Sequence, residues 1–408
     1  MSVPPHRISD GAFRALAGGG GGAAALGELR AAQFSKHLML VRAVTEMFPQ
    51  AAEAYAVLAD LETAAAPVVG AILHHPAVGA WAAATLRGAG DPDRLSAVAL
   101  AAALRAGVKC ELPVPSSDGW ITLPSAGGFP ARGLVIVGVG PDGVTADGHP
   151  VSGWRALPTL STGDFTVTVD DMDPHRWPAG IELPRLHDRR LWESRLGEAW
   201  RLLGDHHWTV REEVASVVTV LTPIGAPAEI PQSESSREAF GAIALSTPAS
   251  GLTLAETFAH ETQHVKLYAL IDVVPLLALD SGDFYYAPWR PDPRPARGLL
   301  NGTYAYLGVT GFWRRQRLAE PTEHADYEFA QWREAAYDAT QTLLAGRGLT
   351  AKGVEFTRLM AETLRPWLDE SVGADALSRA RRAQDERRAA WERRNKRSSR
   401  SAEGRSRS

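Results

Sequence analysis

The chain has 408 residues, 45% of them hydrophobic, so it is long enough to form a large core divided between two or three domains. Its formal net charge is only −4, which excludes a global electrostatic field of the kind that attracts nucleic acid. Cys110 is the only cysteine, and this excludes an internal disulfide, a cysteine-based zinc finger and a self-contained iron–sulfur cluster.

The first residues, MSVPPHRISDGAF, have no charged segment followed by an apolar one, so they do not resemble a secretory signal peptide. No apolar run in the sequence approaches the ~18 residues that a membrane-spanning helix needs. A single cysteine also suits a reducing compartment. These features predict a cytoplasmic protein with no membrane partner and no specific nucleic-acid partner.

An N-terminal helical region is expected over residues 1–108, which are rich in Ala and Leu and include the helical stretch 29–48. Five successive glycines at residues 18–22 interrupt it. Such a run cannot hold a helix, and it lacks the spacing and the Lys-Ser/Thr ending of a phosphate-binding loop. The glycines therefore predict a flexible turn.

A small β-rich module with a linker is expected over residues 109–185. Short apolar runs at 133–140 and 165–169 alternate with turn signals, and the segment VGPDG at 139–143 favours a hairpin over a nucleotide loop. Three prolines, Pro174, Pro178 and Pro184, make residues 171–186 the expected linker. The sequence gives this module no clear role.

Residues 186–375 are expected to form the catalytic region. An amphipathic helix at 191–203 is followed by a β-branched run at 214–224, a polar loop at 232–238 and a short apolar strand at 239–246. A helix at 254–274 comes next, with Thr253 and Glu256 as its capping box and Pro275 as its stop. A proline-rich loop at 285–295 and a helix at about 298–318 complete the pattern. Residues 376–408 form a basic tail that begins helical and that we expect to end disordered.

The helix at 254–274 carries the motif HExxH, formed by His260, Glu261 and His264. Positions i and i+4 lie on one helical face, so the two imidazoles can grip one metal ion, while the Glu can act on a metal-bound water. The alternative is a pair of solvated histidines on a helix. Imidazole ligands suit zinc, iron, cobalt or manganese, so the motif alone leaves the identity of the metal open.

A third metal ligand must come from elsewhere in the chain. The metzincin continuation HExxHxxGxxH is absent, because Leu267 and Leu270 stand where Gly and His are required. Asp292 is our first choice, since the prolines around it form a rigid segment that could fold back over the helix; the alternative is an Asp that starts a turn. Weaker candidates are Asp280, Asp283, Glu320 and His324.

Two arginines flank this Asp. Guanidinium groups braced by prolines bind carboxylates in a bidentate manner, so Arg290 or Arg294 could clamp the distal carboxylate of an oxo-acid if the metal is Fe(II). The alternative is a loop that its own arginines hold together. The fold class that follows is α+β: mostly helical, with a zincin-like core of a strand and the HExxH helix, and a small β-rich module.

Several longer segments add a resemblance. Six segments together resemble sequences of the HExxH-motif peptide-modification family. They are AFGAIALSTP, LAETFAHETQHVKLYALIDVVPL, YYAPWRPDPRP and GLLNGTYAYLGVTGFW, with HRISDGAFRALA and LRAAQFSKHLMLVRA near the N-terminus. The similarity runs from about residue 6 to residue 340. Enzymes of this family accompany ribosomally made precursor peptides and radical-SAM maturases, and members are described as Fe(II)- and 2-oxoglutarate-dependent peptide β-hydroxylases.

The resemblance implies that His260 and His264 are iron ligands, that Glu261 is an acid near the metal, and that Arg290 or Arg294 binds 2-oxoglutarate. It implies a ribosomal precursor peptide as substrate and suggests a radical-SAM maturase as a further partner. An extended peptide could add to the strand at 240–246, with Phe240 and Trp289 as its contacts.

Two other functions stay open at this stage. One is a zinc metallopeptidase with Glu261 as general base, and the other is a non-catalytic scaffold that presents the peptide to a maturase.

Overall fold

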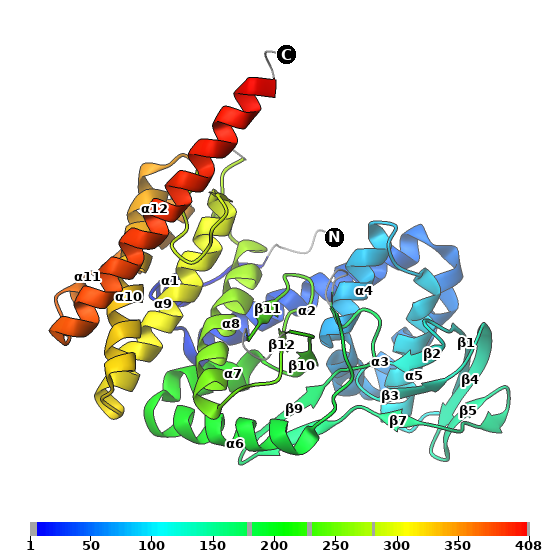
Figure 1. The fold of residues 1–408 in the computed structure, drawn as a ribbon. Coiled ribbons are helices and arrows are strands. Elements are labelled where there is room, and N and C mark those ends of the chain that lie inside the picture. The colour runs from blue at the N-terminus through cyan, green and yellow to red at the C-terminus, as the bar shows by residue number, and fades with distance from the viewer. Residues whose placement is uncertain (1–5, 178–181, 227–230, 280–281, 406–408) are drawn as a thin grey trace. The chain divides into compact units, whose positions relative to one another are not determined.

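The computed structural model describes residues 6–177, 182–226, 231–279 and 282–405, without the side chains of 396–405. The protein is mixed α and β, mostly helical with several small sheets, which confirms the expected class (Figure 1). Its contacts divide it into two compact units. The sheet unit comprises residues 30–200 and 217–254, and the helical unit comprises residues 1–29, 201–216 and 255–408. These units cut across the boundaries expected from the sequence, because the first 29 residues belong with the HExxH region.

The sheet unit contains helices α3, α4 and α5 and twelve of the strands found in the described residues. The helices are α3 (Ala52–Leu73), α4 (Pro76–Leu86) and α5 (Leu95–Ala106). The strands are β1 (Cys110–Pro115), β2 (Trp120–Leu123), β3 (Gly127–Pro130), β4 (Leu134–Gly140), β5 (Gly143–Ala146), β6 (His149–Pro150), β7 (Arg155–Ala156), β8 (Thr159–Thr162), β9 (Phe165–Val169), β10 (Val220–Pro223), β11 (Ser233–Ser235) and β12 (Ala242–Leu245). Four helices have residues in both units: α2 (Gly22–Met47), α6 (Arg189–His206), α7 (Trp208–Val217) and α8 (Gly251–Ile271).

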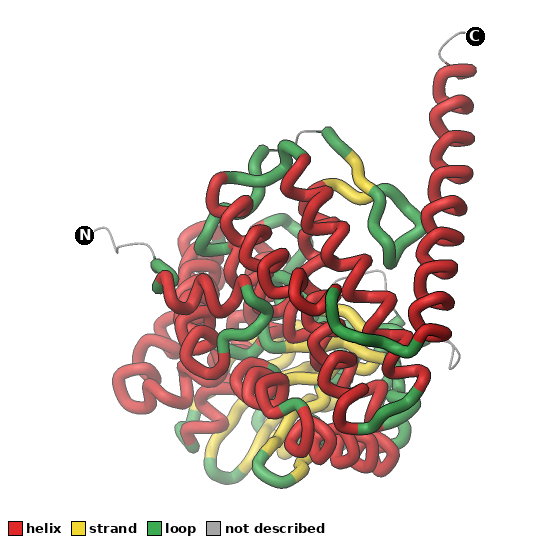
Figure 2. Tube along the Cα trace, turned by 90° about the vertical axis from the view of Figure 1, so that its left-hand side faces the viewer, coloured by secondary structure: helices red, strands yellow, loops and turns green. Residues whose placement is uncertain are grey.

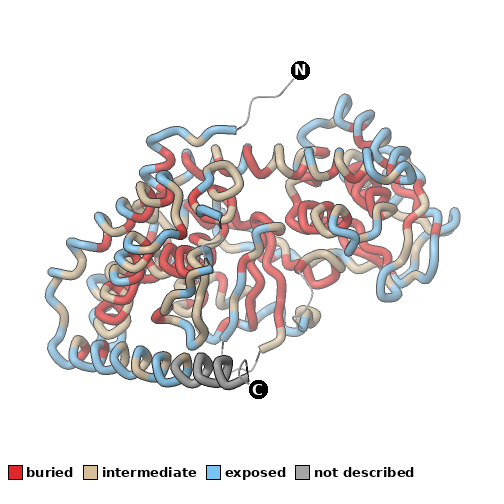
Figure 3. Tube along the Cα trace, turned by 90° about the horizontal axis from the view of Figure 1, so that it is seen from above, coloured by how far each residue is buried: buried red, intermediate tan, exposed pale blue. Residues whose placement is uncertain are grey.

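Three sheets order these strands. One runs β1-β4-β5-β6, a second runs β2-β3-β7, and a third runs β11-β12-β10-β9-β8, with β10 parallel to both of its neighbours. The expected hairpin is confirmed, because Gly140 pairs with Gly143 across a two-residue turn. The expected β-rich module does not form a sheet of its own, since β9 pairs with β10, which follows the module in sequence, and β8 pairs with β9 at the edge of the same sheet. The three central strands of the third sheet, β12, β10 and β9, are mostly buried (Figure 3).

The linker expected at 171–186 is wrong for its first half. Asp170, Asp171 and Asp173 are almost fully buried in a turn after β9, where Asp170 Oδ1 accepts hydrogen bonds from the backbone of Met172 and Asp173. An Arg94 guanidinium nitrogen lies 2.5 Å from Asp173 Oδ2. Burial raises the pKa of Asp170 to about 7, with Asp173 adding to the effect. A high proline content predicts a linker only where the side chains are exposed to solvent. Here arginines offset the free-energy cost of burying the acids.

The segment Pro49–Leu73 is long and apolar enough to cross a membrane by length and composition, which corrects the expectation that no segment reaches that length. Its helical part, α3, is kinked at Ala65, two residues before Pro67. Leu58, Leu61 and other residues of one face belong to the hydrophobic core that α5 shares. A helix packed in a core passes the same test of length and composition, so this segment is weak evidence for a membrane partner.

The helical unit is built from α1 (Asp10–Ala17), α7 (Trp208–Val217), most of α8, α9 (Ala296–Ala319), α10 (Glu323–Ala345), α11 (Ala351–Leu368) and α12 (Ala374–Arg405). A short antiparallel pair, β13 (Phe284–Tyr285) and β14 (Arg294–Pro295), is set among the helices (Figure 2). Helix α10 packs against α9, α11 and α12. The tail expected to end disordered is helical to Arg405, and α12 is exposed along much of its length (Figure 3).

The glycines at residues 18–21 form a turn, which confirms the expected turn, while its expected flexibility stays a prediction. Gly19 has a φ of +87° and Gly21 one of +136°, which glycine adopts without strain. The carbonyls of Gly19 and Gly20 accept hydrogen bonds from the buried Lys266 Nζ, at 3.0 and 3.1 Å. Lys266 Nζ also lies 2.7 Å from Glu213 Oε2. The turn is therefore tied to α8 by a buried, fully hydrogen-bonded ammonium.

Candidate metal centre

Helix α8 confirms the helix expected at 254–274, although it begins slightly earlier. Its cap is Ser250, whose Oγ accepts a hydrogen bond from the Thr253 backbone N at 3.1 Å, so the capping box expected from Thr253 and Glu256 is wrong. Glu256 instead accepts a hydrogen bond from Trp313 Nε1 at 2.9 Å. The Glu256 carboxylate therefore takes no part in the cap. Glu256, His260 and His264 are spaced four residues apart, so they lie along one face of α8.

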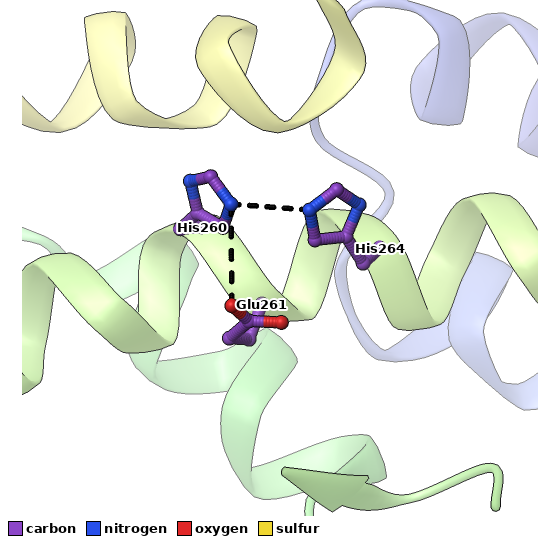
Figure 4. Close-up of side chains that lie close together, drawn as sticks. All are labelled: His260, Glu261 and His264. Carbon is purple, nitrogen blue, oxygen red and sulfur yellow. Dashed lines mark hydrogen bonds and ion pairs between the residues drawn. The ribbon is translucent and has the colours of Figure 1, made fainter. Parts of the chain in front are cut away.

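The two histidines of the motif face one another (Figure 4). His260 Nε2 and His264 Nε2 are 3.1 Å apart, and Glu261 Oε1 lies 3.9 Å from His260 Nε2. Two ligands on one ion with bonds of about 2.1 Å lie about 3.0 Å apart in octahedral and about 3.4 Å apart in tetrahedral geometry. The observed separation falls within this range, so the two imidazoles fit a shared cation.

The protonation of both rings suits a metal. Burial, with a smaller contribution from His264, lowers the pKa of His260 to about 3, so this imidazole is neutral at pH 7 and has a lone pair to give. His264 Nδ1 lies 3.0 Å from Asn301 Oδ1, and the Asn301 amide nitrogen donates to the Tyr268 hydroxyl at 2.9 Å. With the amide oriented in this way, His264 Nδ1 must carry the proton, which leaves Nε2 as the free lone pair.

Among the residues that the structure describes, one group of His, Cys, Asp or Glu could hold a metal ion. It consists of His260, Glu261 and His264, whose ligand atoms all lie within 4.8 Å of one another. Glu261 is buried, with 1% of its surface exposed. Two imidazoles and one carboxylate are the donor set of mononuclear non-haem iron sites, and the same motif also serves zinc.

Aromatic rings cover His260 on the side of α9 and α10. The edge of His260 meets Tyr306 at a centroid distance of 5.5 Å, and Tyr306 in turn contacts Trp289 at 4.7 Å and Trp332 at 4.2 Å. Trp289 can lie on α9 only because residue 302 is glycine, since a Cβ there would be 2.3 Å from Trp289 Nε1. Trp289, expected to contact substrate, therefore lies one ring away from His260.

Asp292 does not join the metal-binding group. Its Oδ1 lies 2.9 Å from Arg290 Nε and its Oδ2 lies 3.1 Å from Arg294 Nη1, on a partly exposed loop. The arginines lower the pKa of Asp292 through these hydrogen bonds, Arg290 most strongly. Arg290 and Arg294 thus hold their own loop together by ion pairs, which was the alternative to a role in binding an oxo-acid. The structure does not support Asp292 as the third ligand.

The weaker candidates for a third ligand that lie in the described residues are also outside the group formed by His260, Glu261 and His264. Asp283 pairs with Arg347, Glu320 accepts a hydrogen bond from Gln316, and the exposed His324 lies 4.0 Å from Glu328. Asp280 lies outside the described residues. Phe240 is buried just before β12 in the sheet unit, so its expected role as a substrate contact stays a prediction.

Sequence reasoning missed the partners that hold the site. Asn301, Tyr306 and Trp332 come from α9 and α10, and nothing in their local sequence marks them as neighbours of His260 or His264. Glu256 carried a detectable signal, because it precedes His260 by four residues on the same helix. Burial raises the pKa of Glu256 to about 7, with a smaller contribution from Glu328.

No family model matches the chain, and no curated protein matches it. The resemblance to the HExxH-motif peptide-modification family therefore stays a prediction, and the geometry of the site carries the functional argument.

Proposed function

We propose that this protein is an Fe(II)- and 2-oxoglutarate-dependent oxygenase that hydroxylates a β-carbon in a ribosomally synthesised precursor peptide. The observation that carries the proposal is the convergence of His260 Nε2 and His264 Nε2 at 3.1 Å beside the Glu261 carboxylate. A set of two imidazoles and one carboxylate is typical of iron oxygenases. The resemblance supplies the substrate class and the cosubstrate.

In this proposal His260 and His264 hold the iron, and Asn301 keeps His264 in the tautomer that binds it. Bound iron with 2-oxoglutarate and dioxygen would supply the oxidising power that replaces a C–H bond by C–OH. Arg290 or Arg294 would bind the distal carboxylate of 2-oxoglutarate in place of its ion pair with Asp292. Tyr306 would exclude water from one side of His260.

The zincin-like core belongs to the same proposal. Strand β12 ends at Leu245 and α8 begins at Gly251, which is the order of strand and HExxH helix found in zinc-peptidase-like folds. This order and the spacing of the motif support the assignment.

A zinc metallopeptidase is the second candidate, and the burial of Glu261 beside His260 favours it. A carboxylate 3.9 Å from a metal-binding nitrogen can act as general base on a metal-bound water. Hydrolysis needs neither oxygen nor 2-oxoglutarate, so the two candidates are separable by their requirements.

The deciding experiment incubates the full chain with the peptide encoded beside its gene, in parallel reactions, followed by tandem mass spectrometry. Fe(II), air and 2-oxoglutarate should together add one oxygen atom at a β-carbon, and omission of any one should abolish the gain. His260→Ala should be inactive, while His149→Ala, which changes an exposed histidine of β6, should stay active. Cleavage by the Zn(II)-loaded protein without air would favour the peptidase.

A scaffold without catalysis predicts a third pattern. His260→Ala and Glu261→Gln would then still support modification of the peptide by a separate radical-SAM maturase, and the protein alone would change the peptide under none of the conditions. That result would refute both enzymatic proposals.

A further inference from the structure

One pocket of the helical unit lies against α12 and has a volume of about 260 Å³. The loop that follows β13 and the helix α12 run beside one another here, and Tyr286 of the loop contacts Trp391 of α12 (Figure 2). The pocket is walled by three tryptophans and three arginines: Trp289, Trp332, Trp391, Arg290, Arg387 and Arg394. No acidic side chain of the described residues lines it.

Two of these side chains offer hydrogen-bond donors that lack an acceptor among the described residues. They are the Trp391 indole N–H and the Arg387 Nε–H, and both nitrogens are inaccessible to solvent, so a ligand reaches them only when these side chains shift. Indole and guanidinium nitrogens can only donate. A ligand that satisfies them must bring acceptor oxygens, and a carboxylate is the strongest acceptor that a peptide carries.

The electrostatics of the pocket select the same ligand. Arg387 lies over the Trp332 ring at 5.3 Å and donates through Nη2 to Gln331 Oε1 at 2.7 Å. A neighbouring pocket on the other side of the loop includes Asp338 and Asp385, which would repel an acid. Of these two pockets, the tryptophan-walled one has arginines and no acidic side chain in its described lining, while the other has Arg388 together with two acids.

The pocket is connected to the metal centre by stacked rings. Trp289 stacks on Tyr306 at 4.7 Å, and Tyr306 meets His260 at 5.5 Å, so the centroids of Trp289 and His260 are at most about 10 Å apart. An extended peptide rises about 3.3 Å per residue, so three or four residues cover this distance.

We infer that the pocket formed by Trp289, Trp332, Trp391 and Arg387 binds an acidic residue of the substrate peptide, three or four residues from the residue that is modified. This inference rests on the proposed function, because only that function makes the peptide a substrate. The binding of an acidic peptide can be tested without any catalytic reaction. The tryptophan faces pack against the methylenes of the acidic side chain, and Arg387 and Trp391 receive its carboxylate.

The test uses metal-free full-length protein labelled with 5-fluorotryptophan and observed by fluorine NMR. The probes are two capped peptides of sequence Gly-Ser-Ala-Glu-Ala-Ser-Gly and Gly-Ser-Ala-Gln-Ala-Ser-Gly. Trp391→Phe and Trp289→Phe assign the pocket resonances, and the exposed Trp208 reports non-specific binding. The Glu peptide should shift the resonances of Trp289 and Trp391 and bind about tenfold more tightly than the Gln peptide.

Arg387→Gln should remove this discrimination, while circular dichroism verifies that the variant is folded. Equal binding of the two peptides, an Arg387→Gln variant that still discriminates, or a shift of Trp208 equal to that of Trp391 would each overturn the inference. Tighter binding of a ten-nucleotide RNA at the same resonances would also overturn it. With a modified peptide in hand, displacing its acidic residue beyond five positions should slow modification about tenfold.

The two proposals fail independently. Selective binding of the Glu peptide without any oxygen addition under the conditions above would refute the oxygenase and leave the pocket intact. Oxygen addition that is indifferent to acidic residues would refute the pocket alone.

Discussion

Asn301→Leu tests the argument for the metal centre most directly, because it removes one interaction and leaves all three residues of the motif in place. The Asn301 carboxamide gives His264 Nδ1 its acceptor at 3.0 Å and so holds the ring with Nε2 toward His260. Loss of an outer partner of a metal-binding histidine weakens metal affinity about 10–100-fold, or about 1.4–2.7 kcal/mol. The leucine is close in volume, so packing should change little.

The assay is competition for Zn(II) and Co(II) against a chromogenic chelator at pH 7.5, which avoids the oxidation of iron. Tyr268→Phe is the matched control, because it removes the hydroxyl that receives the Asn301 amide proton but keeps the acceptor of His264. It should weaken binding less than Asn301→Leu does. A folded Asn301→Leu variant whose affinity stays within about twofold of wild type would refute the assigned tautomer and the role of Asn301.

Three further results are expected. Asp292→Ala should leave Zn(II) affinity within about twofold of wild type, since both carboxylate oxygens pair with arginines; a loss of two orders of magnitude would place Asp292 on the metal after all. Lys266→Met should lower the free energy of unfolding by about 3–5 kcal/mol, because it leaves the buried Glu213 carboxylate without its cation, and urea titration should find this loss partly recovered by adding Glu213→Leu. Glu256 has a pKa of about 7 when folded and 4.5 when unfolded, so its stabilising contribution is complete below pH 4.5 and is lost as pH rises through 7. Metal-free wild type should therefore lose more stability between pH 5 and 8 than Glu256→Gln, and parallel urea curves would contradict this assignment.

The local elements could be read from the sequence where periodicity and turn chemistry were strong. The segment 254–274, most of which forms α8, has no glycine or proline, and the glycine pair around Pro141-Asp142 specifies a two-residue hairpin. Errors occurred where the same local pattern is compatible with two environments. The hydrogen bonds that join the glycine turn at residues 18–21 to α8 were not expected, because the sequence of the turn gives no sign of Lys266, which is more than 240 positions away.

The same limitation applied to the acids. Asp170 and Asp173 lie in a proline-containing segment that is typical of exposed linkers, but both are buried. Arg94, far away in sequence, pairs with Asp173, and backbone N–H groups donate to Asp170. Asp292 was chosen as a ligand from its proline-braced loop, whereas its own neighbours, Arg290 and Arg294, take both of its oxygens.

By itself the sequence determined that two imidazoles and a carboxylate lie within one turn of one helix, because a helix fixes the relative positions of residues four apart. It could not determine what surrounds them. The orientation of His264 by Asn301, the ring that Tyr306 places against His260, and the tryptophan pocket on α12 each join helices that are distant in the chain. Only the packing of the helices brings such groups together. Side-chain contacts between two helices depend on how the helices are placed relative to one another, and the residue order within one helix does not fix that placement.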